Sequence, residues 1–196
     1  MTRSIIPSDP PQARPGGRTQ DVGLRVAEAV LKLLEGGGYA AVTHQAVAEA
    51  AQVGRATVYR RWPTRPLLTL FGIAQGVADR VMIADTGALR TDMTAALSQI
   101  AAFLDSPLGR AALAASMEME VETDARHLFW TPRAQTFQAL FERAIGRGEI
   151  GPGSDWEAAL AMAAGALYFR ILIQDQPIDA DWIARIVTLG LNSLDA

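Results

Sequence analysis

The segment from Arg55 to Trp62 carries the side chains best suited to polar chemistry in this chain. Three arginines, a threonine and a tyrosine lie within eight residues, which is about two turns of a helix. Guanidinium groups bind phosphate and the edge of guanine through paired hydrogen bonds, and hydroxyl groups donate to phosphate oxygens. The segment therefore predicts a nucleic-acid contact.

A helical wheel divides this segment into an inner and an outer face. At 100° per residue, Val58 and Trp62 point the same way and are expected to pack on the first helix of the chain. Ala56, Thr57 and Arg60 then point outward. A helix of this kind fits the major groove of DNA, where the small Ala56 permits close approach or contact with a thymine methyl group.

Tyr59, Arg61 and Arg55 complete the polar set. Tyr59 and Arg61 lie on the flanks of the outer face, where they can meet phosphates on the walls of a groove. The wheel places Arg55 near the buried side, but its long side chain can still reach forward from the first turn. Arginine to guanine is the commonest specific contact with a base.

Two further helices are expected to position this segment. Thr43 can cap a short helix that runs through Ala51, and residues 53–54 supply a break before the Arg55 helix. Before them, apolar residues at helical spacing predict a longer helix between a cap at Thr19 and a stop at residues 36–38. The pattern is that of a three-helix unit with a helix-turn-helix.

The rest of the chain also has helical periodicity and no strand-like alternation, so the fold class is all-α. A larger C-terminal helical domain is expected to follow the N-terminal three-helix domain. Its prolines lie where helices can begin. The expected helices cover 66–83, 89–105, 107–118, 132–147, 155–173 and 179–194.

Charge is divided unequally along the chain. The net charge is −3, but residues 1–66 hold nine Lys or Arg against five acids, and residues 67–196 hold nine against sixteen. Attraction to a polyanion is therefore expected of the N-terminal part alone.

Composition excludes several other classes of protein. Without cysteine, there is no disulfide, thiol nucleophile or thiolate metal site. The uncharged run 158–169 is too short to cross a bilayer, which takes about 20 apolar residues. Residues 1–17 lack the apolar core of a secretion signal and are expected to form a disordered arm, so a cytoplasmic location follows. No cofactor and no metal site are expected.

The residues between 18 and 68 resemble the tetracycline-repressor family. The resemblance is carried by Thr43, by the Ala48 to Ala51 helix, by the Thr57-Val58-Tyr59 core, by the Trp62-Pro63 ending, and by Arg65 followed by two leucines. It implies a homodimer that reads a palindromic double-stranded DNA operator with one helix-turn-helix per half-site, and a small-molecule effector of unknown identity. It implies domain limits of 18–65 for DNA binding and 66–196 for effector binding and dimerisation.

The resemblance also implies which side chains touch DNA. Contacts that recognise bases are expected at Arg55, Ala56, Thr57, Tyr59 and Gln45. Contacts with phosphates are expected at His44, Arg61 and Arg65. The DNA-binding set also includes Arg60, which the helical wheel places outward, and the helix cap Thr43. Arg18 is either a minor-groove contact at the end of the arm or a solvated residue.

Three positions depart from the family pattern. Gln52 stands where the turn usually has glycine, Gly54 where the reading helix usually starts with serine, and Arg65 where lysine is usual. If the turn needs a positive φ at position 52, either Gln52 is strained or Gly54 takes up the distortion.

The C-terminal helices offer a candidate dimer surface and a candidate effector cavity. Small residues on one helix and large apolar residues on the next can pair with their two-fold copies as a four-helix bundle, although both helices can equally be intramolecular core. The expected interface residues are Ala161, Ala164, Gly165, Ile183, Ile186 and Val187. The expected effector-contacting residues, which can equally be plain core, are Phe103, Met117, Phe137, Phe141, Tyr168 and Phe169.

The leading hypothesis is thus a ligand-responsive repressor, with a transcriptional activator of the same fold as the alternative. A helical enzyme is poorly supported, because His44 and His127 fall in different domains and no phosphate-loop or nucleophile motif is present. An architectural DNA binder is opposed by the negative net charge.

Overall fold

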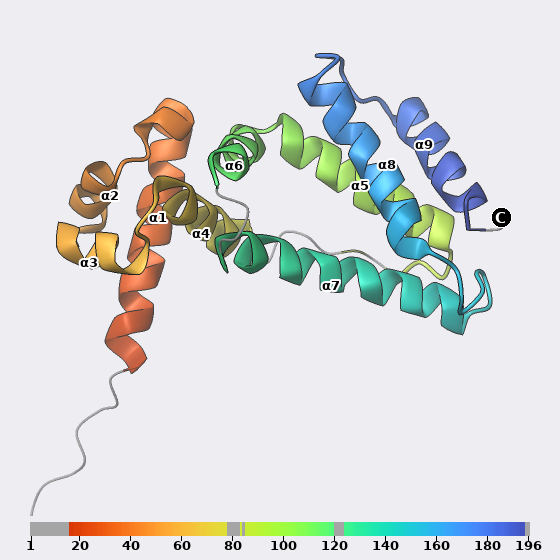
Figure 1. The fold of residues 1–196 in the computed structure, drawn as a ribbon, viewed down its shortest axis with the longest axis horizontal. Coiled ribbons are helices and arrows are strands. Elements are labelled where there is room, and N and C mark those ends of the chain that lie inside the picture. Colours follow the sequence, from red (N-terminus) through yellow and green to blue (C-terminus); the bar gives the residue numbers. More distant parts are fainter. Residues whose placement is uncertain (1–15, 78–82, 84, 120–123, 195–196) are drawn as a thin grey trace, which may run out of the picture.

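The computed structural model describes residues 16–77, 83, 85–119 and 124–194, and within these ranges all regular structure is helical. The all-α prediction is confirmed. Figure 1 shows the N-terminal helices grouped at one end of an elongated molecule and the C-terminal helices at the other. The helices are α1 (Gly16–Ala41), α2 (His44–Ala51), α3 (Arg55–Arg61), α4 (Arg65–Val77), α5 (Leu89–Asp105), α6 (Pro107–Glu118), α7 (Asp124–Gly146), α8 (Trp156–Leu172) and α9 (Ala180–Asn192).

The first hydrophobic core lies among α1 to α4. Val26 and Val30 of α1 are fully buried and belong to the same core as Val58 of α3, which is also fully buried, and Trp62, which is 4% exposed. The ring of Trp62 lies 4.6 Å from that of Phe71 on α4. The predicted inner face of the Arg55 to Trp62 segment is therefore confirmed.

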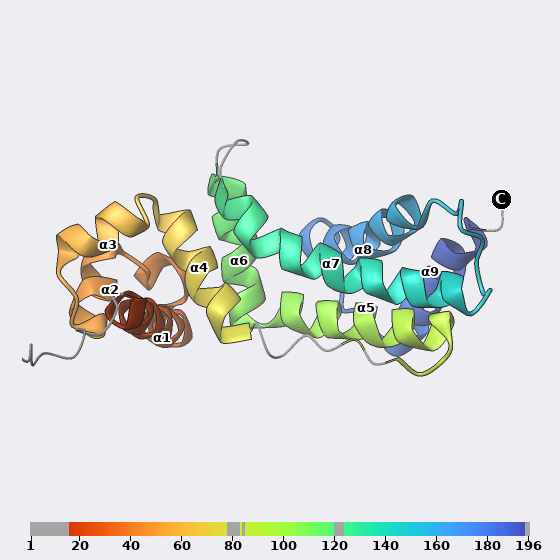
Figure 2. The ribbon, with the colours of Figure 1, turned by 90° about the horizontal axis from the view of Figure 1, so that it is seen from below.

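Helix α6 contributes to the same core although it lies in the C-terminal half of the sequence. Its buried face, Ala111, Ala112, Ala115 and Met119, belongs to the first core, and the helix packs against both α1 and α4. Figure 2 shows α6 crossing beside α4 at the junction with the C-terminal helices. The DNA-binding domain predicted to end at residue 65 thus shares its core with helices beyond that limit.

The second hydrophobic core lies among α5, α7, α8 and α9. Leu97 of α5, Phe141 of α7, Leu167 of α8 and Val187 of α9 are all fully buried there. The Phe141 ring also stacks on Trp156 with a centroid separation of 5.1 Å. Burying a large apolar side chain stabilises a fold by about 1.5–3 kcal/mol, so this core can hold the four helices together.

A tight corner joins α5 to α6. Ser106 caps α6 by accepting a hydrogen bond from the Gly109 amide at 3.1 Å, and Pro107 occupies the first turn of the helix. Gly109 lies so close to the end of α5 that a Cβ atom there would be 1.9 Å from the Phe103 carbonyl oxygen. Only glycine fits this approach of two backbones.

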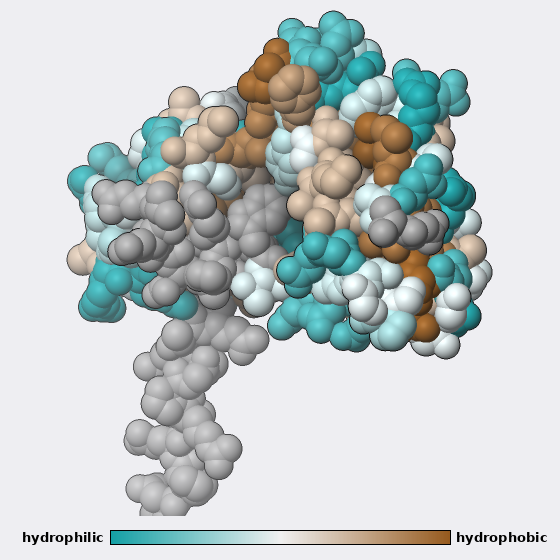
Figure 3. Space-filling view, turned by 45° about the vertical axis from the view of Figure 1, so that its right-hand side comes forward, coloured by the Kyte–Doolittle hydropathy of each residue, from teal (hydrophilic) through white to brown (hydrophobic). Residues whose placement is uncertain are grey.

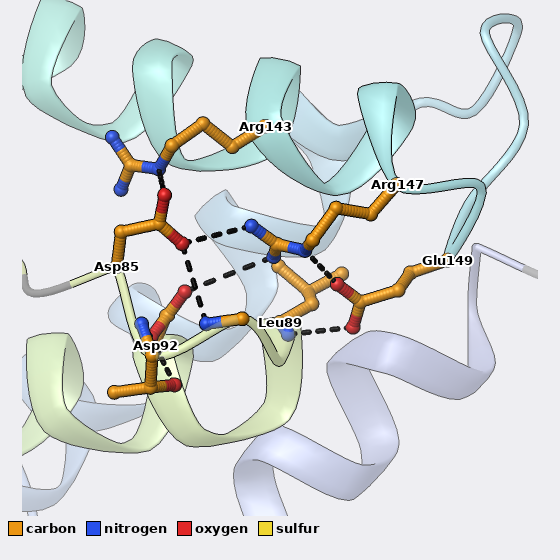
Figure 4. Close-up of polar contacts among 8 residues, drawn as sticks. Asp85, Leu89, Asp92, Arg143, Arg147 and Glu149 are labelled. Atoms are coloured by element: carbon orange, nitrogen blue, oxygen red, sulfur yellow. Dashed lines mark hydrogen bonds and ion pairs between the residues drawn. The ribbon is translucent and has the colours of Figure 1, made fainter.

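At the other end of α5, a polar cluster fixes the helix to the end of α7 (Figure 4). Arg147 lies 2.9 Å from Asp85 and 2.5 Å from Glu149. Glu149 also accepts a hydrogen bond of 2.6 Å from the Leu89 amide, one of the free N–H groups that begin α5. Hydrogen bonding to Glu149 is the main reason why the pKa of Arg147 is raised.

Asp92 is the buried member of this cluster. Its side chain is fully buried, and it accepts hydrogen bonds from the Thr86 amide at 2.9 Å and from the Thr86 hydroxyl at 2.6 Å. Arg147 lies 3.8 Å away and offsets its charge. The segment before α5 is thereby held in one conformation.

Three helix boundaries differ from the sequence-based prediction. Helix α1 begins at Gly16, before the cap predicted at Thr19. The prediction that a helix begins at Pro132 is wrong, because α7 already begins at Asp124 and continues through the proline. Proline keeps a helical φ and removes only one backbone donor, so a helix can pass through it when the surrounding structure offsets the cost of about 3 kcal/mol. In α1, the expected stop at residues 36–38 reduces to a kink at Gly38, where φ is 63°.

Among the described residues, no helix combines the length and the hydropathy needed to span a bilayer.

Candidate DNA-binding site

The turn between α2 and α3 is built around Gln52. Thr43 begins α2 by accepting a hydrogen bond from the Ala46 amide at 3.1 Å, as predicted for a cap. At the other end Gln52 adopts a left-handed conformation with φ 53° and ψ 46°, and its amide donates to the Glu49 carbonyl at 3.2 Å. Arg25 of α1 donates to the carbonyl of Ala51 at 3.3 Å and so holds this end of α2.

Gly54 does not take up the distortion of the turn. Its φ of −58° and ψ of 131° are open to any residue, and its carbonyl accepts from the Thr57 amide at 2.8 Å without a side-chain cap. The alternative that Gly54 absorbs the distortion is thus contradicted, and the strained residue is Gln52. A non-glycine residue in the left-handed region costs on the order of 1 kcal/mol.

Replacing Gln52 with glycine is therefore expected to raise the free energy of unfolding by about 0.5–1 kcal/mol, because relief of strain outweighs the added freedom of the unfolded chain. Urea unfolding followed by circular dichroism measures this change. Ala50→Gly, in the last turn of α2 where φ is helical, should instead lower the free energy of unfolding by a similar amount. Destabilisation by Gln52→Gly would show that the turn carries no such strain.

The outer face of α3 is open to solvent. Arg55, Ala56, Arg60 and Arg61 are exposed and Thr57 is half-buried, so the predicted contact residues of this helix are accessible, although the Arg61 guanidinium turns back toward Trp62. The helix is short and preceded by a sharp turn, so this surface projects from the end of the molecule, as α3 does in Figure 1. We call the outer residues Arg55, Ala56, Thr57, Tyr59, Arg60 and Arg61 the reading face.

Aromatic and guanidinium groups order the reading face. Arg55 donates to the Tyr59 hydroxyl at 3.4 Å, and its guanidinium lies 5.4 Å from the centre of the Tyr59 ring. The Arg61 guanidinium lies 4.6 Å from the centre of the Trp62 ring. Cation–π contacts of this kind restrict long side chains, so the charges are presented in preferred positions.

Two residues of α2 that were predicted to touch DNA lie in different surroundings. Gln45 is exposed, donates to Glu49 at 3.0 Å and borders a shallow groove shared with Arg55. His44 is only 8% exposed, and its ring stacks on Tyr59 with centroids 4.0 Å apart.

Arg65 is held by α6. Its guanidinium forms an ion pair of 3.3 Å with Glu118 and lies 3.8 Å from the centre of the Tyr39 ring. Tyr39 in turn donates to Glu118 at 2.7 Å, and burial is the main reason why the pKa of Tyr39 is raised. Long-range partners such as Glu118 left no signal in the sequence.

The predicted N-terminal contact remains a prediction. Arg18 falls in the first turn of α1, but its side chain lies outside what the structure describes, as do residues 1–15 of the expected arm.

The six predicted effector-contacting residues lie in different surroundings, and their role stays a prediction. Phe137 and Phe141 are buried, Phe103 and Tyr168 are half-buried against the second core, and Met117 and Phe169 are exposed. Among the described residues, a cavity of about 520 Å³ instead lies between α5 and residues 175–183, and none of the six lines it.

Arg133 is a partly buried charge in the C-terminal domain that sequence reasoning missed. Desolvation lowers its pKa, and desolvation likewise raises the pKa of the neighbouring Tyr168.

The six predicted dimer residues divide between surface and core. Ala161 and Gly165 are exposed and Ala164 and Ile186 half-buried, whereas Ile183 and Val187 are buried in the second core of the same chain. Ile183 and Val187 are thus part of the core of the chain itself, and the interface stays a prediction.

The exposed apolar residues of α8 and α9 are different ones. We define the α8–α9 face as the exposed large apolar residues of these two helices and the segment between them: Met162, Phe169, Leu172, Ile173 and Leu189. Figure 3 shows hydrophobic side chains gathered on the surface of the C-terminal half. In the sequence, the helical spacing of Met162, Gly165, Phe169 and Leu172 could have predicted this face, because it places the four residues on one side of α8.

Family models match both parts of the chain. Residues 27–66 match the model described as bacterial regulatory proteins, tetR family, and residues 83–189 match the tetracyclin repressor-like C-terminal domain. The HTH-type transcriptional regulator YdeS of Bacillus subtilis is 26% identical over 92% of this chain and 94% of its own length. The DNA-binding transcriptional repressor TetR of Mycobacteroides abscessus is 31% identical over 80% of this chain and 85% of its own.

Solved structures agree with these matches. The TetR family transcription regulator SCO0332 is 30% identical and superposes with a TM-score of 0.76 over 88% of this chain and 98% of its own. A TetR transcriptional regulator from Rhodococcus sp. RHA1, at 18% identity, shares the fold with a TM-score of 0.60 over 90% of this chain and 96% of its own. With a helix-turn-helix that exposes a basic reading face and with family matches along most of its length, the chain belongs to the tetracycline-repressor family of transcriptional regulators.

Proposed function

We propose that this regulator is a homodimeric repressor that binds a palindromic operator through two reading faces and is released by a small-molecule effector. The observation that carries the proposal is the exposed set of Arg55, Tyr59, Arg60 and Arg61 on one short helix whose opposite side, Val58, is fully buried. Such a helix fits the major groove, where arginine reads guanine and the flanking groups bind phosphate.

The charge of the chain supports a specific rather than an architectural mode of binding. Binding through the backbone alone needs many phosphate contacts and a broadly positive surface, whereas the net charge here is −3. Basic residues concentrated on one helix suit recognition of a defined site. We therefore place the protein in the cytoplasm with the DNA, as a regulator and not as an enzyme.

We propose that the dimer forms through the α8–α9 face. Phe169 and Leu189 are each more than half exposed in the single chain, at 55% and 60%. Large apolar residues exposed on neighbouring helices favour an interaction site, and a two-fold axis lets the same face meet its copy. One reading face alone contacts too few bases for useful specificity.

Release by an effector is proposed to act through α6. Because the Ala111 to Met119 face of α6 is part of the first core and Glu118 holds Arg65, a displacement of α6 must move the N-terminal helices. The two reading faces must lie about 34–36 Å apart to enter successive major grooves. An effector that binds better to a wrongly spaced form lowers operator affinity by the ratio of its two affinities.

Arg60→Ala tests the reading face. An operator is first selected by the purified protein from a pool of random duplexes, and Kd is then measured by fluorescence anisotropy at one salt concentration. Loss of one paired arginine contact is worth about 1–3 kcal/mol, so we expect a roughly 5- to 150-fold weaker Kd for the operator. The control Arg110→Ala removes an exposed arginine on α6 and should leave Kd unchanged.

The assignment of the reading face fails if Arg60→Ala and Arg110→Ala bind the operator equally well. A reporter gene placed downstream of the operator then distinguishes a repressor from an activator. Reporter expression should fall when the protein is present, whereas a rise would identify an activator.

A further inference from the structure

We infer that His44 is a positioning residue of the reading face, which holds the Tyr59 ring and the end of α3 in place without touching DNA itself. This inference rests on the proposed function, because it concerns how that same face keeps its shape. It changes the role expected of His44 from the sequence, which was a phosphate contact.

The first observation is the stacking of His44 on Tyr59. The two rings are nearly parallel, with an interplanar angle of 4° and centroids 4.0 Å apart. His44 is 8% exposed whereas Tyr59 is 41% exposed, so the imidazole forms a buried support beneath an exposed phenol. A ring supported in this way loses little conformational freedom when its hydroxyl meets a phosphate, and less freedom lost means tighter binding.

The second observation is a hydrogen bond from His44 to the end of α3. The Nε2 atom lies 2.6 Å from the carbonyl oxygen of Trp62, the residue that follows the last turn of the helix. Carbonyl groups at a helix end lack donors within the helix, and Pro63 offers no N–H. A protonated Nε2 supplies the missing donor and ties the start of α2 to the end of α3.

The stack on Tyr59 and the hydrogen bond to Trp62 together limit the contacts that His44 can make with DNA. In the neutral imidazole, a proton on Nε2 leaves Nδ1 without one, so no N–H group remains to donate to a phosphate. The near-complete burial of the ring agrees with this. The Tyr59 hydroxyl, in contrast, extends the chain of contacts outward by accepting from Arg55 at 3.4 Å. His44 thus acts on DNA through Tyr59 and Arg55.

Substitutions at position 44 separate the stack from the hydrogen bond. His44→Ala removes both, His44→Phe keeps a flat ring without the donor, and His44→Gln keeps a donor without the ring. Kd is measured for the selected operator and for a random duplex over a range of salt concentrations. We expect His44→Ala to weaken operator binding about tenfold, equivalent to about 1.4 kcal/mol, and to leave the slope of log affinity against log salt unchanged, because the neutral phenol releases no counterion. We expect His44→Phe to recover most of the operator affinity and His44→Gln to recover less.

A double-mutant cycle gives a readout that general destabilisation would not move. In a Tyr59→Ala background, His44→Ala should cause a smaller loss of operator affinity than in the unsubstituted protein, because the part of its effect that passes through the phenol is already gone. The matched control is Val47→Ala, a fully buried change on the same helix. It should lower the melting temperature without altering operator Kd below that temperature.

Two results would overturn the inference. If His44→Ala weakens binding to both duplexes equally and reduces the slope of log affinity against log salt by about 0.9, His44 contacts a phosphate directly. If the losses from His44→Ala and Tyr59→Ala simply add, the stack does not position Tyr59. Failure of the proposed function has a different signature, since the unsubstituted protein would then bind every selected duplex no better than a random one.

Discussion

Gly109→Ala is expected to lower the free energy of unfolding by about 3 kcal/mol or more, the range of severe packing defects. The added Cβ atom would lie 1.9 Å from the Phe103 carbonyl oxygen and 2.8 Å from the Leu104 Cα atom. Both are backbone atoms that cannot rotate away, so the corner between α5 and α6 must open. Because α6 is part of the first core, the opening also disturbs the N-terminal helices.

Urea unfolding monitored by circular dichroism measures this loss. Gly36→Ala is the matched control, since Gly36 lies within α1 and no atom lies within 4 Å of the added Cβ. That change should raise the free energy of unfolding by up to about 1 kcal/mol, because alanine favours the helix. Equal stability of the two variants would mean that the corner relaxes freely.

Phe169→Asp is expected to convert the proposed dimer into a monomer and to weaken operator binding at least about 100-fold. Two-fold symmetry places the substitution in the interface twice, and each unpaired carboxylate would have to be desolvated. The single chain should remain folded, since Phe169 is 55% exposed within it. A monomer then loses the second half-site and the gain in effective concentration that a dimer provides.

Light scattering after size-exclusion chromatography gives the oligomeric state, and anisotropy gives the operator Kd. Leu24→Asp is the control for the oligomeric state, because Leu24 of α1 is 51% exposed and lies outside the α8–α9 face. A Phe169→Asp protein that is still dimeric would place the interface on another surface.

The reading face could be predicted closely because it depends on local rules. A wheel of eight residues placed Val58 and Trp62 inside, and both are buried. The Thr43 cap follows from side-chain chemistry, and the structure shows its hydrogen bond to Ala46. These features need only helical geometry and the nearest neighbours in the chain.

Features that depend on distant parts of the chain could not be predicted in this way. Periodicity marks Ile183 as apolar, but it does not say whether the residue meets its own chain or a second copy, and the structure buries it in the second core. The ion pair of Arg65 with Glu118 joins residues 53 positions apart. His44 was likewise assigned from its place in a motif, although its surroundings depend on Tyr59 and Trp62 of the next helix.

The position of α6 limits how this regulator can be rebuilt as a chimera. Fusing residues 1–65 to a different sensor domain would remove α4 and, with α6, the side chains of Ala111, Ala112 and Ala115, and would expose the apolar surface of α1 that these helices cover. A transplanted DNA-binding segment therefore needs a recipient domain whose own α6 carries small residues at the matching positions. Otherwise α6 must be transferred together with the segment. Exchange of recognition specificity is simpler on the outer face of α3, where Ala56 and Arg60 can be changed without touching either core.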